Sequence, residues 1–375
     1  MEFRDLKTQY QKYKQEIDFA VQEVLTNANF IGGKEVKELE DQLADYVGVK
    51  HCITCANGTD ALNLVMMAWD IKDGDAVFIP DFTFFSTGEI VSFRGATPVF
   101  VDVDRETFNI DIIKLERAII KTIEEGKLNP KAIIPVDLFG LPADYIEIER
   151  IAKKYDLLVL EDGAQGFGGS INGRRACSFG DAATTSFFPA KPLGCYGDGG
   201  AIFTNDDELA ELLKSLKVHG KGDNKYDNVR IGVNSRLDTV QAAILKVKLK
   251  AFIDHEVEDV NRIYQLYNER LDGIVEIPYI PNGFYSSFAQ YTIKLKNKEQ
   301  RDGLQAKLKD HGIPSMIYYV KSMHKQDAFS DLESDDREFD ITNELCDTVL
   351  SLPMHPYLSE EEVNKVCGVI KQFIE

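Results

Sequence analysis

The chain has few cysteines and no long apolar run, and each shortage restricts what the protein can be. Six cysteines among 375 residues are too few for a disulfide scaffold, so we expect reduced thiols. No apolar run approaches the length of about 20 residues that a membrane-spanning helix needs. Residues 1–7 also lack a hydrophobic export segment. We therefore expect a cytoplasmic protein that does not associate with membranes.

Positive charge is scarce as well. The chain has 43 Lys and Arg residues against 62 Asp and Glu residues, which gives a formal net charge of -19. Nucleic acids and anionic membranes bind to basic surfaces, so we expect neither as a partner. Any anionic ligand must therefore be held by a local site.

Motifs for several common kinds of site are missing. We find no GxxxxGKS/T phosphate loop, and no GxGxxG lies between a predicted strand and a predicted helix. Cys52 and Cys55 have CxxC spacing, but on the strand predicted at 51–55 they point to opposite faces and cannot share a metal. No second CxxC pair completes a site. We therefore predict structural thiols and no metal site.

What remains is the pattern of a large α/β protein. A chain of 375 residues that is 44% hydrophobic can bury a core for about two domains. Strands are predicted at 51–55, 76–79, 98–103, 132–136, 157–160, 182–187 and 201–204. Helical patterns separate most of them, and helices are also expected within 4–27 and at 38–46. This alternation predicts an α/β domain with a mainly parallel sheet.

The pattern changes after a strongly helical stretch at 238–260. Strand-like runs follow at 275–279, 290–295 and 315–319, and helices are predicted at 300–311, from 340 and from 359. We therefore predict a large domain over residues 1–250 and a smaller α+β domain over residues 251–375.

One lysine has unusual neighbours. Lys191 lies among aromatic and small residues between positions 185 and 200, whereas most lysines lie on solvated surfaces. An ammonium in such a place loses hydration, and its neutral amine can form an imine with an aldehyde. Pro189 and Pro192 restrict the backbone on both sides, and four nearby glycines allow a ligand to approach closely. Lys191 is therefore our candidate Schiff-base residue.

Polar residues follow several predicted strands, where sites of α/β proteins collect. Gly58 and Thr59 begin a helix whose free N–H groups suit an anion, although an ordinary helix cap has the same pattern. Ser186 lies at the end of another strand. Asp162 ends a third strand and could pair with a protonated pyridine nitrogen, cap a helix or bind magnesium. The magnesium alternative lacks its phosphate loop.

Two further features remain open. Phe84 follows a predicted strand and could either stack on a heterocycle or pack in the core. The segment 214–236 is basic, and its cations could hold a diphosphate or a carboxylate or could form a solvated charge run. They are Lys214, Lys217, His219, Lys221, Lys225, Arg230 and Arg236. The solvated alternative suits Arg236 least, because this residue lies within Val-Asn-Ser-Arg-Leu-Asp.

In combination these motifs resemble the DegT/StrS family of nucleotide-sugar aminotransferases that depend on pyridoxal phosphate. The likeness covers nearly the whole chain and is densest at 55–62, 160–165, 185–204, 232–244 and 351–357. It implies the fold type I of pyridoxal-phosphate-dependent transferases, which is the aspartate aminotransferase-like fold, and it implies pyridoxal 5'-phosphate as the cofactor.

The resemblance also implies roles for individual residues. Lys191 matches the imine lysine, Asp162 the partner of the ring nitrogen, and Gln165 the neighbour of the ring hydroxyl. The matches to phosphate and ring contacts are Gly58, Thr59, Ser186 and Phe84. Asn234 matches an asparagine that reaches the phosphate from the other subunit, which implies a homodimer with shared active sites.

The likeness is strongest to enzymes that aminate a 3-keto uronic acid carried by uridine diphosphate. It implies UDP-2-acetamido-2-deoxy-3-oxo-glucuronic acid as the substrate and L-glutamate as the donor, in the synthesis of bacterial surface polysaccharides such as O-antigen and lipopolysaccharide. In such relatives Arg236 would approach the sugar acid, and the pocket would be lined by Phe30, Tyr318 and Tyr319.

Three alternatives remain. An aminotransferase for another keto sugar would keep every cofactor residue, whereas a dehydratase of this family has histidine in place of Lys191. A regulatory protein without activity would be expected to lose Lys191 or Asp162, and both are present.

Overall fold

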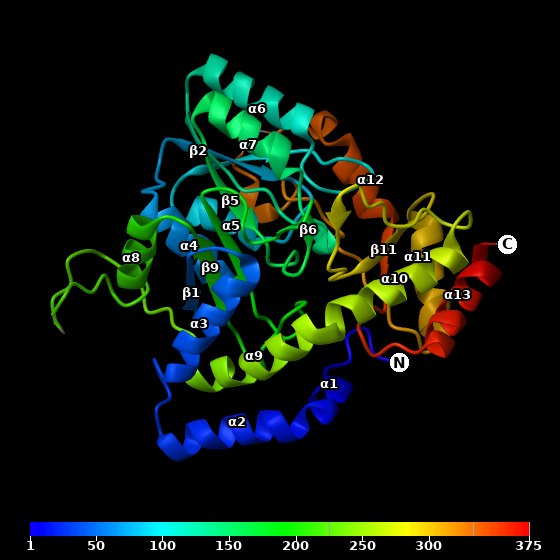
Figure 1. Cartoon of the computed structure of the whole chain (residues 1–375). Helices are drawn as coiled ribbons and strands as arrows, with labels where there is room; N and C mark the ends of the chain where they lie inside the picture. Colours follow the sequence, from blue (N-terminus) through cyan, green and yellow to red (C-terminus); the bar gives the residue numbers. More distant parts are fainter. Residues whose placement is uncertain (225, 333, 375) are drawn as a thin grey trace.

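The computed structural model describes residues 1–224, 226–332 and 334–374, so Lys225 of the basic segment lies outside the described residues. A seven-stranded sheet with the order β1-β9-β8-β5-β4-β2-β3 forms its centre (Figure 1). The strands are β1 (His51–Cys55), β2 (Asp75–Pro80), β3 (Thr97–Val101), β4 (Asn129–Ile133), β5 (Leu158–Asp162), β8 (Ala182–Ser186) and β9 (Gly200–Thr204). Strand β9 runs antiparallel to both neighbours, and the other strands run parallel to one another. The predicted α/β class with a mainly parallel sheet is confirmed.

Helices cover both faces of this sheet. One face buries its apolar residues with α4 (Gly58–Ala68), α5 (Ser86–Phe93) and α8 (Asp207–Leu216). The other face packs on α3 (Lys34–Val47), α6 (Ile112–Glu125), α7 (Tyr145–Tyr155) and α9 (Thr239–Ala251). Because side chains alternate along a strand, Cys55 joins the first core and Cys52 the second. The prediction that these two thiols face opposite sides is confirmed.

A long helical stretch leads to the C-terminal part of the chain (Figure 1). Helix α9 continues through a π-helical turn at Phe252–Glu256 into α10 (Val257–Leu271). The C-terminal part has its own buried cluster, to which α10 contributes. Its further elements are β11 (Tyr291–Lys294), α11 (Lys298–Asp310), α12 (Asp340–Thr348), β12 (Val349–Leu352) and α13 (Glu360–Ile374). The domain boundary predicted at residue 250 stays a prediction.

Two of the predicted C-terminal strands are wrong. Strand β11 pairs antiparallel with β12, which the sequence pattern did not predict. The runs 275–279 and 315–319 each form only an isolated bridge, at Glu276 and Met316. The apolar pattern predicted strands at these two runs. Strands β11 and β12 instead form their ladder of hydrogen bonds with each other.

The remaining elements are short or peripheral. A small sheet with the order β10-β6-β7 joins β10 (Phe284–Tyr285) to β6 (Ser170–Ile171) and β7 (Arg174–Arg175). At the N-terminus, α1 (Leu6–Lys12) precedes α2 (Lys14–Asn27), which runs alongside α9 (Figure 1). The helices predicted within 4–27 are thus confirmed. Among the described residues, none of the helices combines the length and the apolar character that crossing a membrane requires.

Candidate active site

A buried carboxylate lies at the carboxyl edge of the sheet. Asp162 is the last residue of β5, and its side chain accepts hydrogen bonds from the Thr87 hydroxyl at 2.9 Å and from the Ala164 main-chain N–H at 3.2 Å. Burial raises the pKa of Asp162, while these two hydrogen bonds and the charge of Lys191 oppose the rise. A cationic group placed on its free lone pairs would favour the ionised form of the carboxyl.

Lys191 lies in the turn that follows β8. Its main-chain N–H donates to the Phe188 carbonyl at 2.9 Å, and the residue is half-buried. Burial lowers the pKa of Lys191, while the charge of Asp162 acts in the opposite sense. The desolvation expected for this lysine is therefore present, and it makes the neutral, nucleophilic amine more accessible. Its role as the imine lysine stays a prediction.

The three predicted phosphate ligands come together at the start of α4. Asn57 caps this helix by accepting the Asp60 N–H at 2.8 Å, and Gly58 is its first residue. A Cβ atom on Gly58 would lie 2.7 Å from the Cβ of Ser186, so the two residues are in direct contact. The Thr59 hydroxyl lies 2.8 Å from that of Ser86, which begins α5.

Two helix N-termini therefore meet at this point of the sheet edge. Free N–H groups and the positive ends of both helix dipoles favour an anion there. The hydroxyl of Ser86 is an addition that the sequence pattern did not single out. The role of Gly58, Thr59 and Ser186 as phosphate ligands stays a prediction.

The amide of Gln165 is held in place near the same edge. Its Oε1 accepts the Phe139 N–H at 3.0 Å, and its Nε2 donates to the Tyr319 hydroxyl at 3.3 Å. The Tyr319 ring packs edge-on against Phe82, with centroids 5.8 Å apart. Burial raises the pKa of Tyr319, so its hydroxyl stays protonated at neutral pH. Tyr319, predicted to line the substrate pocket, thus lies beside a predicted cofactor residue.

Phe84 is available for stacking. Its side chain is 55% exposed, whereas that of Phe82 two residues earlier is 1% exposed. The alternative in which Phe84 is a core residue is therefore wrong. An exposed aromatic face next to the start of α5 can stack on a planar ring.

The other predicted substrate residues form a separate group near the start of α9. The Phe30 carbonyl accepts the Thr239 N–H at 2.9 Å, and the Phe30 side chain is 46% exposed. Arg236 is half-buried three residues before Thr239, and no described carboxylate or carbonyl binds its guanidinium. Asn234 is exposed. No hydrogen bond or ion pair between described residues joins this group to Tyr318 and Tyr319.

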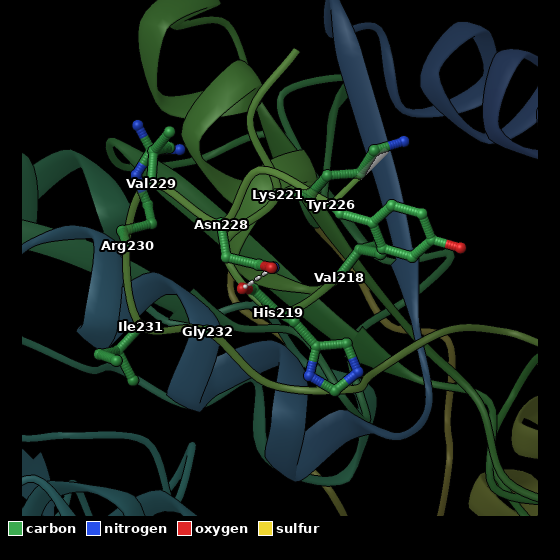
Figure 2. Close-up of a pocket in the computed structure, with 9 residues that line it drawn as sticks. All are labelled: Val218, His219, Lys221, Tyr226, Asn228, Val229, Arg230, Ile231 and Gly232. Atoms are coloured by element: carbon green, nitrogen blue, oxygen red, sulfur yellow. Dashed lines mark hydrogen bonds between the residues drawn. The ribbon is translucent and has the colours of Figure 1, made fainter. Parts of the chain in front are cut away.

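The basic segment does not form one anion site. Lys214 pairs with Glu211 at 2.7 Å, and Lys217 donates to the Thr54 carbonyl at 2.6 Å, so the chain itself satisfies both cations. A hollow of about 750 Å³ is lined by residues between Val218 and Gly232 (Figure 2). None of the predicted cofactor residues is among the described residues that line it.

Pyridoxal phosphate fits the residues gathered at the sheet edge. Gly58 has no side chain to push α4 away from Ser186, so the helix N-terminus stays available for the phosphate. The lone pairs of Asp162 suit the protonated ring nitrogen, and Lys191 suits the aldehyde. When bound, the cofactor supplies a conjugated ring that stabilises negative charge on a substrate carbon.

A mainly parallel sheet with these groups at its carboxyl edge defines a pyridoxal-phosphate-dependent aminotransferase. Residues 11–371 match the DegT/DnrJ/EryC1/StrS aminotransferase family, and the chain belongs to this family. The predicted fold type, cofactor and enzyme class are confirmed.

Individual relatives cover the full chain. It is 45% identical over 371 residues to the UDP-2-acetamido-2-deoxy-3-oxo-D-glucuronate aminotransferase of Pseudomonas aeruginosa, with 99% of both chains covered. It is 42% identical over 372 residues to a pleiotropic regulatory protein of Geobacillus stearothermophilus, with 98% and 97% covered. The crystal structure of a DegT DnrJ EryC1 StrS aminotransferase from Brucella abortus has 50% identity and a TM-score of 0.97, with 100% of this chain and 99% of that chain covered.

Proposed function

We propose that this protein transfers an amino group from L-glutamate to UDP-2-acetamido-2-deoxy-3-oxo-glucuronic acid, in the synthesis of a bacterial surface polysaccharide such as O-antigen or lipopolysaccharide. The observation that carries the reaction class is a buried carboxylate, Asp162, at the end of β5, together with Lys191 in the turn that follows the neighbouring strand β8. The substrate rests on the 45% identity to the P. aeruginosa enzyme of that name.

The side chains divide the chemical work. Lys191 Nζ would take a proton from the α-carbon of glutamate and return it in a later step. Bound pyridoxal phosphate would supply the carbon that keeps the amino group, and water would release 2-oxoglutarate. Lys191 Nζ moves protons in the reverse order when the keto sugar receives the amine. Asp162 would hold positive charge at the ring nitrogen of bound pyridoxal phosphate, and Gln165, itself hydrogen-bonded to Tyr319, would lie beside the ring hydroxyl.

Arg236 is the proposed contact for the sugar carboxylate. Its guanidinium has no carboxylate partner among the described residues, and a planar fork of donors binds a carboxylate bidentately. The ring of Phe30 is exposed, and its carbonyl is bound to the start of α9, so this ring could cover the sugar, as could Tyr318 with Tyr319. A uronic acid would therefore bind better than a neutral sugar.

A cytoplasmic homodimer with shared active sites accounts for the two separate groups of substrate residues. No hydrogen bond or ion pair between described residues joins Asn234 or Arg236 to Lys191, Asp162 or Gln165 of the same chain, so a second chain could bring them to that site. The same segment exposes apolar side chains at Val229 and Ile231, the latter 88% exposed (Figure 2). Such side chains are typical of a surface that another chain covers.

Absorbance of the cofactor-loaded protein tests this function. L-glutamate should bleach the visible band, and the uronic keto sugar should restore it, whereas Lys191→Ala should do neither. Arg236→Gln should raise KM for the uronic substrate at least about 10-fold, since a charge-assisted hydrogen bond contributes about 1.5–3 kcal/mol. The matched control is Arg150→Gln, which removes an exposed arginine paired with Glu147.

Two outcomes would favour other functions. If a neutral 3- or 4-keto sugar on UDP, dTDP or GDP restores the band as well as the uronic sugar, the substrate assignment is wrong. If the protein binds the cofactor but glutamate and other amino donors never bleach it, a regulatory role gains support. The observation that supports a regulatory role is the 42% identity to the G. stearothermophilus protein, which is named a pleiotropic regulatory protein.

A further inference from the structure

Arg4 contacts the main chain at the proposed catalytic lysine. Its Nη2 donates to the carbonyl oxygens of Lys191 at 3.0 Å and Pro192 at 3.2 Å, across 187 and 188 residues of sequence. The N–H of Lys191 is already bound to the Phe188 carbonyl. The peptide groups on both sides of Lys191 are therefore fixed, one by its own turn and the other by Arg4.

A buried carboxylate, Glu256, acts electrostatically on Arg4. Burial lowers the pKa of Arg4, while the charge of Glu256 acts in the opposite sense. Glu256 is buried and accepts hydrogen bonds from the Tyr357 hydroxyl and, at 3.5 Å, from Gln9 Nε2. The guanidinium of Arg4 is thus bound to the two carbonyls of the lysine turn and electrostatically favoured by an acid of the α9–α10 connection.

The preceding residue connects this contact to the C-terminal part of the chain. The Phe3 carbonyl accepts the Met354 N–H at 3.2 Å. The Phe3 ring lies 6.3 Å from the ring of Tyr318, a predicted substrate residue. Residues 3 and 4 therefore join the lysine turn to the C-terminal segment that carries Tyr318.

From this geometry we propose that Arg4 is a positioning residue for the transamination: it holds the main chain of Lys191 so that Nζ reaches the reacting carbon. The inference rests on the proposed role of Lys191. Arg4 contacts carbonyl oxygens and no predicted cofactor side chain, so its loss should act on the rate of proton transfer and not on substrate affinity. A misplacement of about 1 Å at a reacting group lowers a rate by about 100-fold.

The test is the glutamate half-reaction of the cofactor-saturated protein, followed as bleaching of the visible band in a stopped-flow instrument. We expect Arg4→Gln to lower the maximal rate about 10- to 100-fold with KM for glutamate within about twofold of wild type. Arg4→Lys should recover part of the rate, because an ammonium can reach one carbonyl but cannot reproduce the planar fork.

Arg301→Gln is the matched control. Arg301 is a buried arginine of α11 that donates to the Cys346 carbonyl at 3.0 Å, so its loss removes the same kind of bond from another part of the fold. This variant should melt at a lower temperature without a change in the bleaching rate. Equal slowing in the Arg301 and Arg4 variants would reduce Arg4 to a general stabilising residue and overturn the proposal.

The remaining outcomes are also decisive. A bleaching rate of Arg4→Gln within about twofold of wild type overturns the positioning role alone. If wild type itself does not respond to glutamate, the proposed function fails and this inference fails with it. Should Arg4→Gln not fold, Arg4→Lys decides, because the proposal requires a lower maximal rate at unchanged KM in that variant too.

Discussion

Replacing Gly58 by alanine tests whether the start of α4 and the end of β8 are as close as the structure shows. The added Cβ would lie 2.7 Å from Ser186 Cβ, 3.2 Å from its Oγ and 3.3 Å from its Cα. Carbon atoms in contact prefer about 3.5–4.0 Å. The helix start or the strand end must therefore move by up to about 1 Å.

Two opposing effects set the size of the change. Overpacking of this kind costs about 1–3 kcal/mol, while alanine gains up to about 1 kcal/mol over glycine in a helix. We therefore expect a net loss of about 1–2 kcal/mol in the free energy of unfolding. The phosphate should lose well-aligned N–H donors, and one charge-assisted hydrogen bond contributes about 1.5–3 kcal/mol. Cofactor affinity should then fall about 10- to 100-fold.

The assays are thermal melting of the cofactor-free protein and titration of pyridoxal phosphate by absorbance. Gly368→Ala is the matched control, because Gly368 lies within α13 and a Cβ there meets no atom within 4 Å. The control should be as stable as wild type or slightly more so, with unchanged cofactor affinity. Adding Ser186→Gly to Gly58→Ala removes the clashing Cβ and should restore much of the lost stability. An unchanged melting temperature and affinity in Gly58→Ala would refute the close contact.

Three other changes have expected outcomes. Asp162→Asn should slow bleaching by glutamate at least about 100-fold, because breaking a buried charge pair costs about 3–5 kcal/mol. An unchanged stopped-flow rate would contradict the proposed role of Asp162 as partner of the ring nitrogen. Burial raises the pKa of Glu161 and that of Asp137, the latter to about 7. The free energy of unfolding should therefore fall as pH rises from about 4 through 7, where the two buried acids ionise. In thermal melts across this pH range, the melting temperature of Glu161→Gln should fall less than that of wild type. Burial lowers the pKa of His324, but its 2.6 Å contact with Asp81 and its other contacts raise the pKa overall. The protonated pair therefore stabilises the fold fully below a pH of about 6.5, and this stabilisation is lost as pH rises. His324→Gln should lower the melting temperature more at pH 6 than at pH 9.

The sequence pattern predicted the sheet well because buried parallel strands leave a strong local signal. Such strands are apolar runs that end abruptly at polar residues, as at Asp162 and Ser186. Strand β1 begins and ends at the predicted residues, 51 and 55. The same signal placed the polar side chains at one edge, because the carboxyl ends of parallel strands meet there. Two of the three predicted C-terminal strands, at 275–279 and 315–319, form only isolated bridges, to β11 and β12, whereas the strand predicted at 290–295 is β11.

Contacts between distant residues left no comparable signal. Thr87 binds Asp162 across 75 residues, and Arg4 binds the Lys191 carbonyl across 187 residues. Neither side chain breaks a local pattern: a threonine in the first turn of a helix and an arginine before a helix are both common. Ser86 and Thr87 are adjacent hydroxyl residues that follow a predicted strand. This pair is the sequence signal that could have identified Ser86 and Thr87 as site residues.

The acidic charge of the protein bears on the proposed anion site, which relies on main-chain N–H groups. A formal charge of -19 repels phosphates and carboxylates at long range, and salt of physiological strength screens that repulsion beyond about 8 Å. Within this distance the first turns of α4 and α5 present N–H groups and dipole ends that need no counter-ion. Lys214 and Lys217 cannot add to this attraction, since their own chain already binds them. Arg236 differs because it has no described partner, so its donors remain available for the carboxylate of the proposed uronic acid.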